Sequence, residues 1–168
     1  MYFFIAVLII VIILSFVLFY KLFDLKNINN NLDVAEVNLQ QVLDKKKELL
    51  YNLRDCISDE VAKKIYPEDK DLDLFELEES LFNIRWEFNK LSSKDYKDKK
   101  EVQKVMKELN NLEDDIEGLK DFYNTYARRF NLAFVKKPFT LFYKLFKLNE
   151  KKLFNYRKLE QYEILKED

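Results

Sequence analysis

The first twenty residues of the chain are almost entirely apolar, and the first charged side chain is Lys21. At about 1.5 Å per residue, a helix of this length spans a bilayer hydrocarbon core of roughly 30 Å. A lone strand in lipid would leave its backbone groups unsatisfied, whereas a helix pairs them internally. The pattern therefore predicts a transmembrane anchor over residues 1–23 that contacts the lipid bilayer. The side chains taken to represent its lipid-facing surface are Phe3, Ile9, Ile13, Phe16 and Phe19.

Several features distinguish this segment from a cleaved signal peptide. The residues before its apolar core carry no basic side chain, and the sequence around Tyr20 lacks a small-residue cleavage site. The basic residues near the span lie only on its carboxyl side, at Lys21, Lys26 and 45–47. Since basic flanks stay in the cytoplasm, we expect the N-terminus outside and the rest of the chain inside. The richness in Lys, Asn, Ile, Phe and Tyr is typical of AT-rich bacterial genomes, which suggests the bacterial plasma (inner) membrane.

Beyond the anchor, apolar residues recur at helical spacing from Ile28 to Ile57. No glycine or proline interrupts the asparagine-rich stretch 27–31, so a helix continuous with the anchor is favoured over a kink there. Pro67 disfavours a helical conformation at the residue before it, which predicts that this helix continues to Tyr66. Lys46 falls on the apolar stripe, where its stem is expected to pack while its ammonium reaches solvent.

Two capping boxes mark the starts of later helices, Asp73 with Glu76 and Asp98 with Glu101. The apolar residues of both helices alternate in spacings of three and four, as packed helices require. Those of the first are Leu74, Leu77, Leu81, Ile84, Phe88 and Leu91. Those of the second are Val102, Val105, Leu109, Leu112, Ile116, Leu119, Tyr123, Tyr126, Phe130 and Ala133.

The expected fold class is all-α, an N-terminal transmembrane helix followed by an antiparallel bundle of three to four long helices. Each bundle helix should reverse the direction of the one before it. The second capped helix should end at Pro138, and Gly118 within it suggests a close helix contact. The predicted regions are the anchor 1–23, a bundle domain 24–147 and a C-terminal helical tail 148–168.

The composition excludes several kinds of function. A formal net charge of −1 provides no basic field to hold a nucleic acid. The chain has no histidine and one cysteine, Cys56, which removes common general bases and metal ligands. Acidic neighbours such as Glu78–Glu79 and 113–115 are interpreted as solvated helix faces, because charged residues make up 35% of the chain. We therefore expect no catalytic residues, no cofactor and no metal.

The region around the second capped helix also resembles the carboxyl-terminal signature of the LemA family. In this sequence the signature comprises Tyr123-Asn124, Phe130-Asn131, Phe134 and Pro138. The segment 43–50 is similar to another family motif in the first bundle helix. Phe130 stands where the family has a second tyrosine, and Lys137 where it has a phenylalanine, so the chain resembles a divergent member. The resemblance implies an antiparallel bundle on one anchor, an external N-terminus and no established enzymatic activity.

Two groups of side chains are candidate binding sites. Asn124 and Asn131 are interpreted as register-fixing residues that bond neighbouring helices, rather than as a ligand pair, and Tyr123, Tyr126 and Phe130 as core. The other group is an aromatic patch that could contact a protein partner or a membrane surface, and an end cap of the bundle is favoured. It contains Phe139, Phe142, Tyr143 and Phe146.

The function expected from the sequence is non-catalytic tethering, scaffolding or partner binding at the cytoplasmic face of the membrane. The protein partner is unidentified, and self-association of the chain is left open. The alternative is a membrane-anchored coiled-coil component of division or envelope machinery, and an enzyme has the least support.

Overall fold

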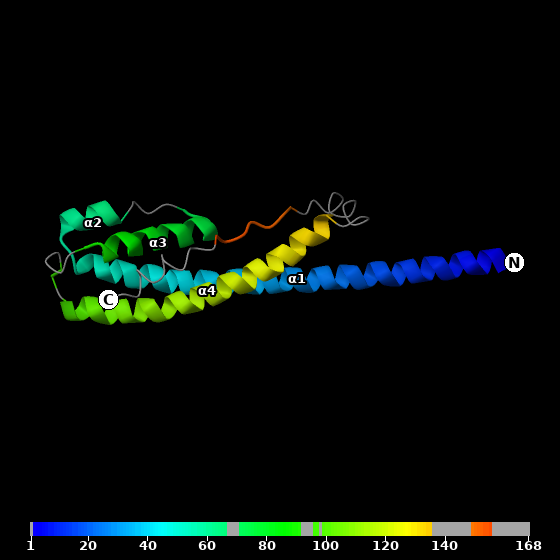
Figure 1. Ribbon diagram of the computed structural model, residues 1–168, viewed down its shortest axis with the longest axis horizontal. Helices are drawn as coiled ribbons and strands as arrows, with labels where there is room; N and C mark the ends of the chain where they lie inside the picture. Colours follow the sequence, from blue (N-terminus) through cyan, green and yellow to red (C-terminus); the bar gives the residue numbers. More distant parts are fainter. Residues whose placement is uncertain (1, 67–70, 92–95, 98, 136–148, 156–168) are drawn as a thin grey trace. The chain divides into compact units, whose positions relative to one another are not determined.

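The computed structural model describes residues 2–66, 71–91, 96–97, 99–135 and 149–155. Within these ranges the chain forms helices α1 (Tyr2–Asp55), α2 (Asp59–Ile65), α3 (Leu74–Asn89) and α4 (Lys99–Val135) (Figure 1). No β-strand occurs in the described part of the chain, although one antiparallel bridge joins Ile57 and Tyr96. The all-α prediction is confirmed.

The chain divides into two compact units whose boundaries fall inside α1 and α4. Unit 1 consists of Met1–Val34 and Tyr123–Leu153, and unit 2 of Ala35–Phe122 and Phe154–Asp168. The region boundaries predicted at residues 23 and 147 are not tested by this division and stay predictions.

Helix α1 continues through the asparagine-rich stretch, as predicted. Two side chains there form local hydrogen bonds: Asn31 Nδ2 donates to the Asn27 carbonyl oxygen at 2.9 Å, and Asn29 Nδ2 donates to Asp33 Oδ2 at 3.1 Å. Each bond joins residues four apart, so it follows the helix instead of competing with it.

The prediction that this helix reaches Tyr66 is wrong, because α1 ends at Asp55. The backbone leaves the helix at Cys56, whose carbonyl oxygen accepts a hydrogen bond from Lys97 N at 2.7 Å. Ser58 is extended and precedes α2, which has acidic residues in its first turn and basic residues in its last. That charge order complements the dipole of α2.

The start of α3 follows the predicted capping box. Asp73 Oδ1 accepts hydrogen bonds from Phe75 N at 2.9 Å and Glu76 N at 2.8 Å. Glu76 Oε2 in turn accepts from Asp73 N at 3.2 Å, which completes the reciprocal pair. The second predicted capping box cannot be assessed, since Asp98 lies outside the described residues.

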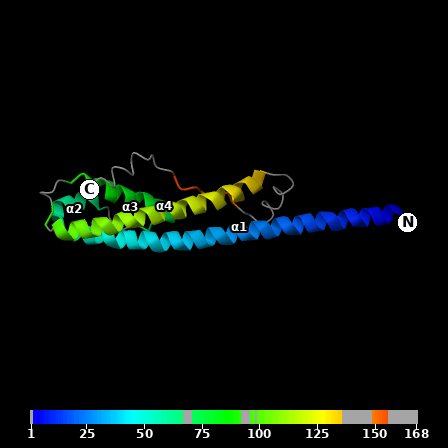
Figure 2. The same cartoon turned by 60° about the horizontal axis from the view of Figure 1, so that its bottom comes forward.

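The core of unit 2 forms where α1, α3 and α4 meet. Figures 1 and 2 show α4 running antiparallel to the carboxyl-terminal part of α1. The contacts Glu78–Lys120 and Arg85–Asn110 run in opposite order along α3 and α4, so these two helices are also antiparallel. Helix α3 therefore runs parallel to α1, which corrects the expectation that it would reverse direction.

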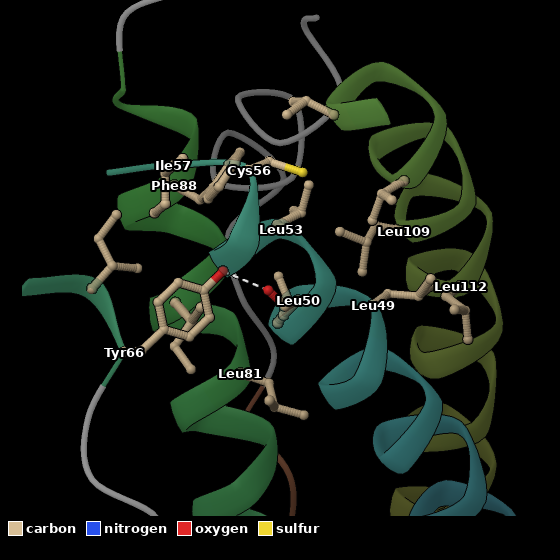
Figure 3. Packing of buried hydrophobic residues seen from close by; sticks show 14 of the residues in the cluster. Leu49, Leu50, Leu53, Cys56, Ile57, Tyr66, Leu81, Phe88, Leu109 and Leu112 are labelled. Carbon is tan, nitrogen blue, oxygen red and sulfur yellow. Dashed lines mark hydrogen bonds between the residues drawn. The ribbon is translucent and has the colours of Figure 1, made fainter. Parts of the chain in front are cut away.

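Figure 3 shows the core of unit 2 in detail, with Leu49, Leu50 and Leu53 of α1 between α3 and α4. Leu81, Ile84 and Phe88 are all buried, which confirms the centre of the predicted stripe. Leu74 and Leu77 are half-buried, and Leu91 lies beyond the end of α3. Each fully buried aliphatic or aromatic side chain contributes about 1.5–3 kcal/mol. The cluster also includes Leu109 and Leu112 of α4.

Candidate functional site: an exposed apolar helix and buried charges in the bundle

The amino-terminal part of α1 presents its apolar side chains to the surroundings. The predicted lipid-facing residues are all exposed, from 51% for Ile9 to 75% for Phe3. Ile13, Phe16 and Phe19 fall between these values. The helix is long and apolar enough to cross a membrane, and none of its most apolar 18-residue window is buried. Ser15 Oγ donates to the Val11 carbonyl oxygen at 2.8 Å, so this hydroxyl is satisfied within the helix.

The rest of unit 1 has a small core that includes the family-motif residues of α4. Tyr123 and Phe130 are buried, which confirms them as core, while Tyr126 is half-buried. Asn124 is fully buried, consistent with a structural role beside the apolar stripe. Phe134 also belongs to α4, but its side chain, like Pro138, lies outside what the structure describes.

Asn131 fixes a non-helical segment instead of bonding a neighbouring helix. Its Nδ2 donates to the Lys151 carbonyl oxygen at 2.9 Å, and its Oδ1 accepts from Lys151 N at 2.8 Å. The Asn131 side-chain amide thus bonds both the backbone N–H and the backbone carbonyl oxygen of Lys151. The predicted helix–helix role of Asn131 is wrong in that respect, because its partner lies in a segment that is not helical.

Residues 149–155 have no helix, so the predicted helical tail is wrong for this part of the chain. Within unit 2, Phe154 is buried and stacks on Phe75 with ring centroids 4.3 Å apart. Aromatic packing at Phe154 and the hydrogen bonds of Lys151 therefore hold this segment in place of helical hydrogen bonds. The predicted aromatic patch at Phe139, Phe142, Tyr143 and Phe146 lies outside the described residues.

A buried ion pair joins α1 and α4 in unit 2. Lys46 Nζ and Glu113 Oε1 lie 2.6 Å apart, and the two side chains are 0% and 5% exposed. Lys46 Nζ and Glu113 Oε1 have no hydrogen bond of normal geometry with the described residues, so their contact is described as an ion pair. The expectation that the Lys46 ammonium reaches solvent is therefore wrong. A carboxylate on the facing helix compensates for the burial of this charge.

A second set of buried charges joins α3 and α4. Lys120 Nζ donates to Glu78 Oε1 at 3.1 Å and to Glu117 Oε1 at 2.8 Å, and the lysine side chain is 1% exposed. The solvated-face interpretation is correct for Glu79, Asp114 and Asp115, which are exposed, but wrong for the buried Glu78 and Glu113.

A third polar contact in unit 2 comes from the fully buried Arg85 of α3. Its Nη2 atom donates to Asn110 Oδ1 at 2.9 Å, and its Nη1 atom contacts the Met106 sulfur. Together these three contacts fix the register of α4 against α1 and α3, because a shift by one residue would leave buried charges unpaired. No group of three potential metal ligands occurs among the described residues.

The end of the bundle core holds a buried phenol. Tyr66 Oη donates to the Leu50 carbonyl oxygen at 2.5 Å (Figure 3). Burial raises the pKa of the Tyr66 phenol well above its usual value, although the positive charge of Arg54 acts in the opposite direction. The neutral phenol therefore persists as a hydrogen-bond donor under alkaline conditions.

Two further positions differ in how well they were predicted. Cys56 is buried at the end of α1, as expected of a small boundary residue, and its thiol contacts the Asn52 carbonyl oxygen at 3.6 Å. Gly118 is exposed, and a Cβ atom built there would have no neighbour within 4 Å. The prediction of a close helix contact at Gly118 is therefore wrong.

Comparisons with known proteins identify the carboxyl-terminal half of the chain. No curated protein and no solved structure matches the chain. The family model that does match covers residues 76–165, which include α3 from Glu76 onward, all of α4 and the segment held by Asn131. On this evidence, which agrees with the motif around Tyr123 and Asn131, the chain belongs to the LemA family.

Proposed function

We propose that this protein is a single-pass membrane protein that displays a non-catalytic helical bundle at the cytoplasmic face of the bacterial plasma membrane. The bundle would act there by tethering, scaffolding or binding a partner. The observation that carries this proposal is that no residue of the most apolar 18-residue window of α1 is buried. In water such a surface would be far larger than the apolar patches of soluble monomers, whereas in lipid it is solvated.

The distribution of charge supports the proposed orientation. Lys21 and Lys26 follow the apolar stretch directly. Basic residues close to a span favour its cytoplasmic side. The proposal therefore places unit 2, with its buried ion pairs, in the cytoplasm.

The described polar groups favour a structural or binding role over catalysis. Lys46, Glu78, Glu113 and Lys120 are all buried in ion pairs between helices. A catalytic acid or base must reach a substrate, and these groups face other helices instead. This argument supports binding as the kind of activity and leaves the partner to experiment.

The test combines membrane extraction with reporter fusions. The full chain should stay in the membrane fraction after carbonate washing, and deletion of residues 2–20 should release it. A fluorescent protein fused to the C-terminus should fluoresce in the cytoplasm, whereas a fused alkaline phosphatase should be inactive. Release of the full chain by carbonate, or an active phosphatase, would overturn the proposal.

A further inference from the structure

Unit 2 contains a partly open cavity of about 660 Å³ between the end of α3 and the first turns of α4. This volume lies within the range of about 300–1,000 Å³ that small-molecule and peptide-side-chain pockets occupy. Its apolar wall consists of Leu91, Val102 and Met106, with Tyr96 beside them. The cavity is therefore large enough for several residues of a ligand and has an apolar surface on one side.

Asn89, the last residue of α3, lines this cavity with a buried and unsatisfied amide. Neither its Nδ2 nor its Oδ1 has a hydrogen-bond partner in the described part of the chain. Leaving a buried polar group unsatisfied costs about 1–3 kcal/mol, so natural structures seldom retain one without a role. A peptide group offers one donor and one acceptor, which matches both free atoms of Asn89.

Asn110 lines the same cavity and is oriented by the protein. Its Oδ1 accepts a hydrogen bond from the buried Arg85 at 2.9 Å. The amide of Asn110 therefore has Nδ2 left as its donor, and a donor is suited to a carbonyl or carboxylate oxygen.

The charges at the cavity have one sign. Lys99 and Lys107 line it and are exposed, and with Gln103 they are spaced four residues apart along one face of α4. Among the described residues that line the cavity, none is acidic. Two ammonium groups with no lining carboxylate attract an anionic ligand, whereas a basic ligand would be repelled.

We propose that this cavity binds a short acidic peptide segment of a partner protein. In the complex, Asn89 pairs with a peptide group of the ligand, and Lys99 and Lys107 bind its carboxylates. Leu91, Val102 and Met106 contact an apolar side chain. The inference rests on the proposed binding role of the bundle and gives that role a ligand class.

The binding experiment uses the full chain in phosphatidylcholine nanodiscs and a fluorescein-labelled five-residue peptide of alternating aspartate and leucine. A peptide with lysine in place of aspartate is the matched control. Fluorescence anisotropy should show saturable binding of the acidic peptide that weakens with added salt, and no saturable binding of the lysine peptide. Equal binding of both peptides, or of neither, would overturn the proposal.

Variants locate the binding to the cavity. Lys99→Glu combined with Lys107→Glu should lower the affinity for the acidic peptide at least about tenfold, because attraction becomes repulsion. Lys104→Glu changes an exposed lysine of the same helix that does not line the cavity, and it should leave the affinity within about threefold. Equal losses in the double variant and the control would contradict a local site.

Asn89→Leu separates binding from folding. Because the unsatisfied amide is removed, the melting temperature should stay the same or rise, while binding of the acidic peptide is lost. A lower melting temperature with unchanged binding would assign Asn89 a structural role and overturn its part in the site. Comparing amidated and free-acid peptides shows whether the ligand is an internal acidic segment or a C-terminus. None of these measurements depends on which side of the membrane unit 2 occupies, so the proposed orientation can fail independently.

Discussion

The amino-terminal end of α1 exposes apolar side chains, whereas its carboxyl-terminal end buries a charged one. Near its N-terminus, Phe3 and Phe16 are more than 70% exposed, whereas near its C-terminus the charged side chain of Lys46 is completely buried. A simple rule of apolar inside and polar outside fails at both ends, for different reasons. At the first end the surrounding medium is proposed to be lipid, and at the second a carboxylate on α4 compensates the buried charge. Exposed apolar residues on a helix thus indicate which medium surrounds it. A buried charged residue indicates that an opposite charge lies on the helix packed against it.

The largest effect is expected from charge placed at the first end. Replacing both Ile9 and Ile13 by aspartate exchanges two favourable insertion terms for two costs of about 2.5–3.5 kcal/mol each, enough to prevent stable insertion. Carbonate extraction should then release the double variant from membranes. As the control, Val34→Asp with Val37→Asp changes two exposed valines of the same helix beyond the apolar stretch and should leave extraction unchanged. Equal retention of both double variants would contradict a lipid environment for residues 9–13.

The next effect is expected from uncoupling the buried charge at the second end. Glu113→Gln leaves the Lys46 ammonium buried without its carboxylate and should lower the free energy of unfolding by about 3–5 kcal/mol. The fluorescence of Trp86, the single tryptophan of the chain, should report unfolding in denaturant. Lys46→Met with Glu113→Leu should recover most of the loss, since no charge stays buried.

The matched control is an ion pair on the surface of unit 2. Lys64 and Glu60 lie 3.4 Å apart with side chains 72% and 86% exposed. Glu60→Gln should therefore change the free energy of unfolding by less than about 1 kcal/mol. If the buried and exposed pairs respond alike, Lys46 and Glu113 are not the buried pair described above.

A smaller effect concerns pH. The raised pKa of Tyr66 means that the folded chain holds this proton where the unfolded chain releases it. Its contribution is complete below about pH 10, and stability should fall by up to about 1.4 kcal/mol per pH unit above that value. Tyr66→Phe keeps the ring and should show a shallower fall between about pH 9 and 11.5. Parallel curves for the two proteins would show that Tyr66 does not contribute to the alkaline loss.

The smallest effect is expected at the start of α3. Asp73→Ala removes the acceptor for two backbone amides and should cost about 1 kcal/mol. Asp71→Ala changes a nearby exposed carboxylate and is expected to be neutral. Denaturant midpoints of the two variants measure the difference, and identical midpoints would mean that the capping box contributes nothing.

The parts of the fold that depend on local spacing were predictable from the sequence. The stripe of Leu81, Ile84 and Phe88 follows from helical periodicity, and the capping box of Asp73 from the side chains that can satisfy the first amides of a helix. Continuity of α1 through residues 27–31 was predictable for the same reason. Each of these features is decided within one or two turns.

The parts that depend on distant partners were not predictable in the same way. The end of α1 at Asp55 carries no glycine or proline signal, because its cause is the pairing of Cys56 and Ile57 with residues 96–97. Likewise, Glu113 is buried because it faces Lys46 of α1, whereas its neighbour Asp114 is exposed. The one available signal was Lys46 on an apolar stripe, since a charge there requires an opposite charge on the helix that packs against it.

The backbone hydrogen bond between Lys97 and Cys56 has a practical consequence. The Cys56 sulfhydryl is the only one in the protein and is shielded while the backbone beside it is paired with Lys97. An alkylating reagent can react there only when this end of unit 2 opens, so the reaction rate measures the opening equilibrium. Alkylation of Cys56, followed by mass spectrometry, thus reports local unfolding of the natural protein without any substitution.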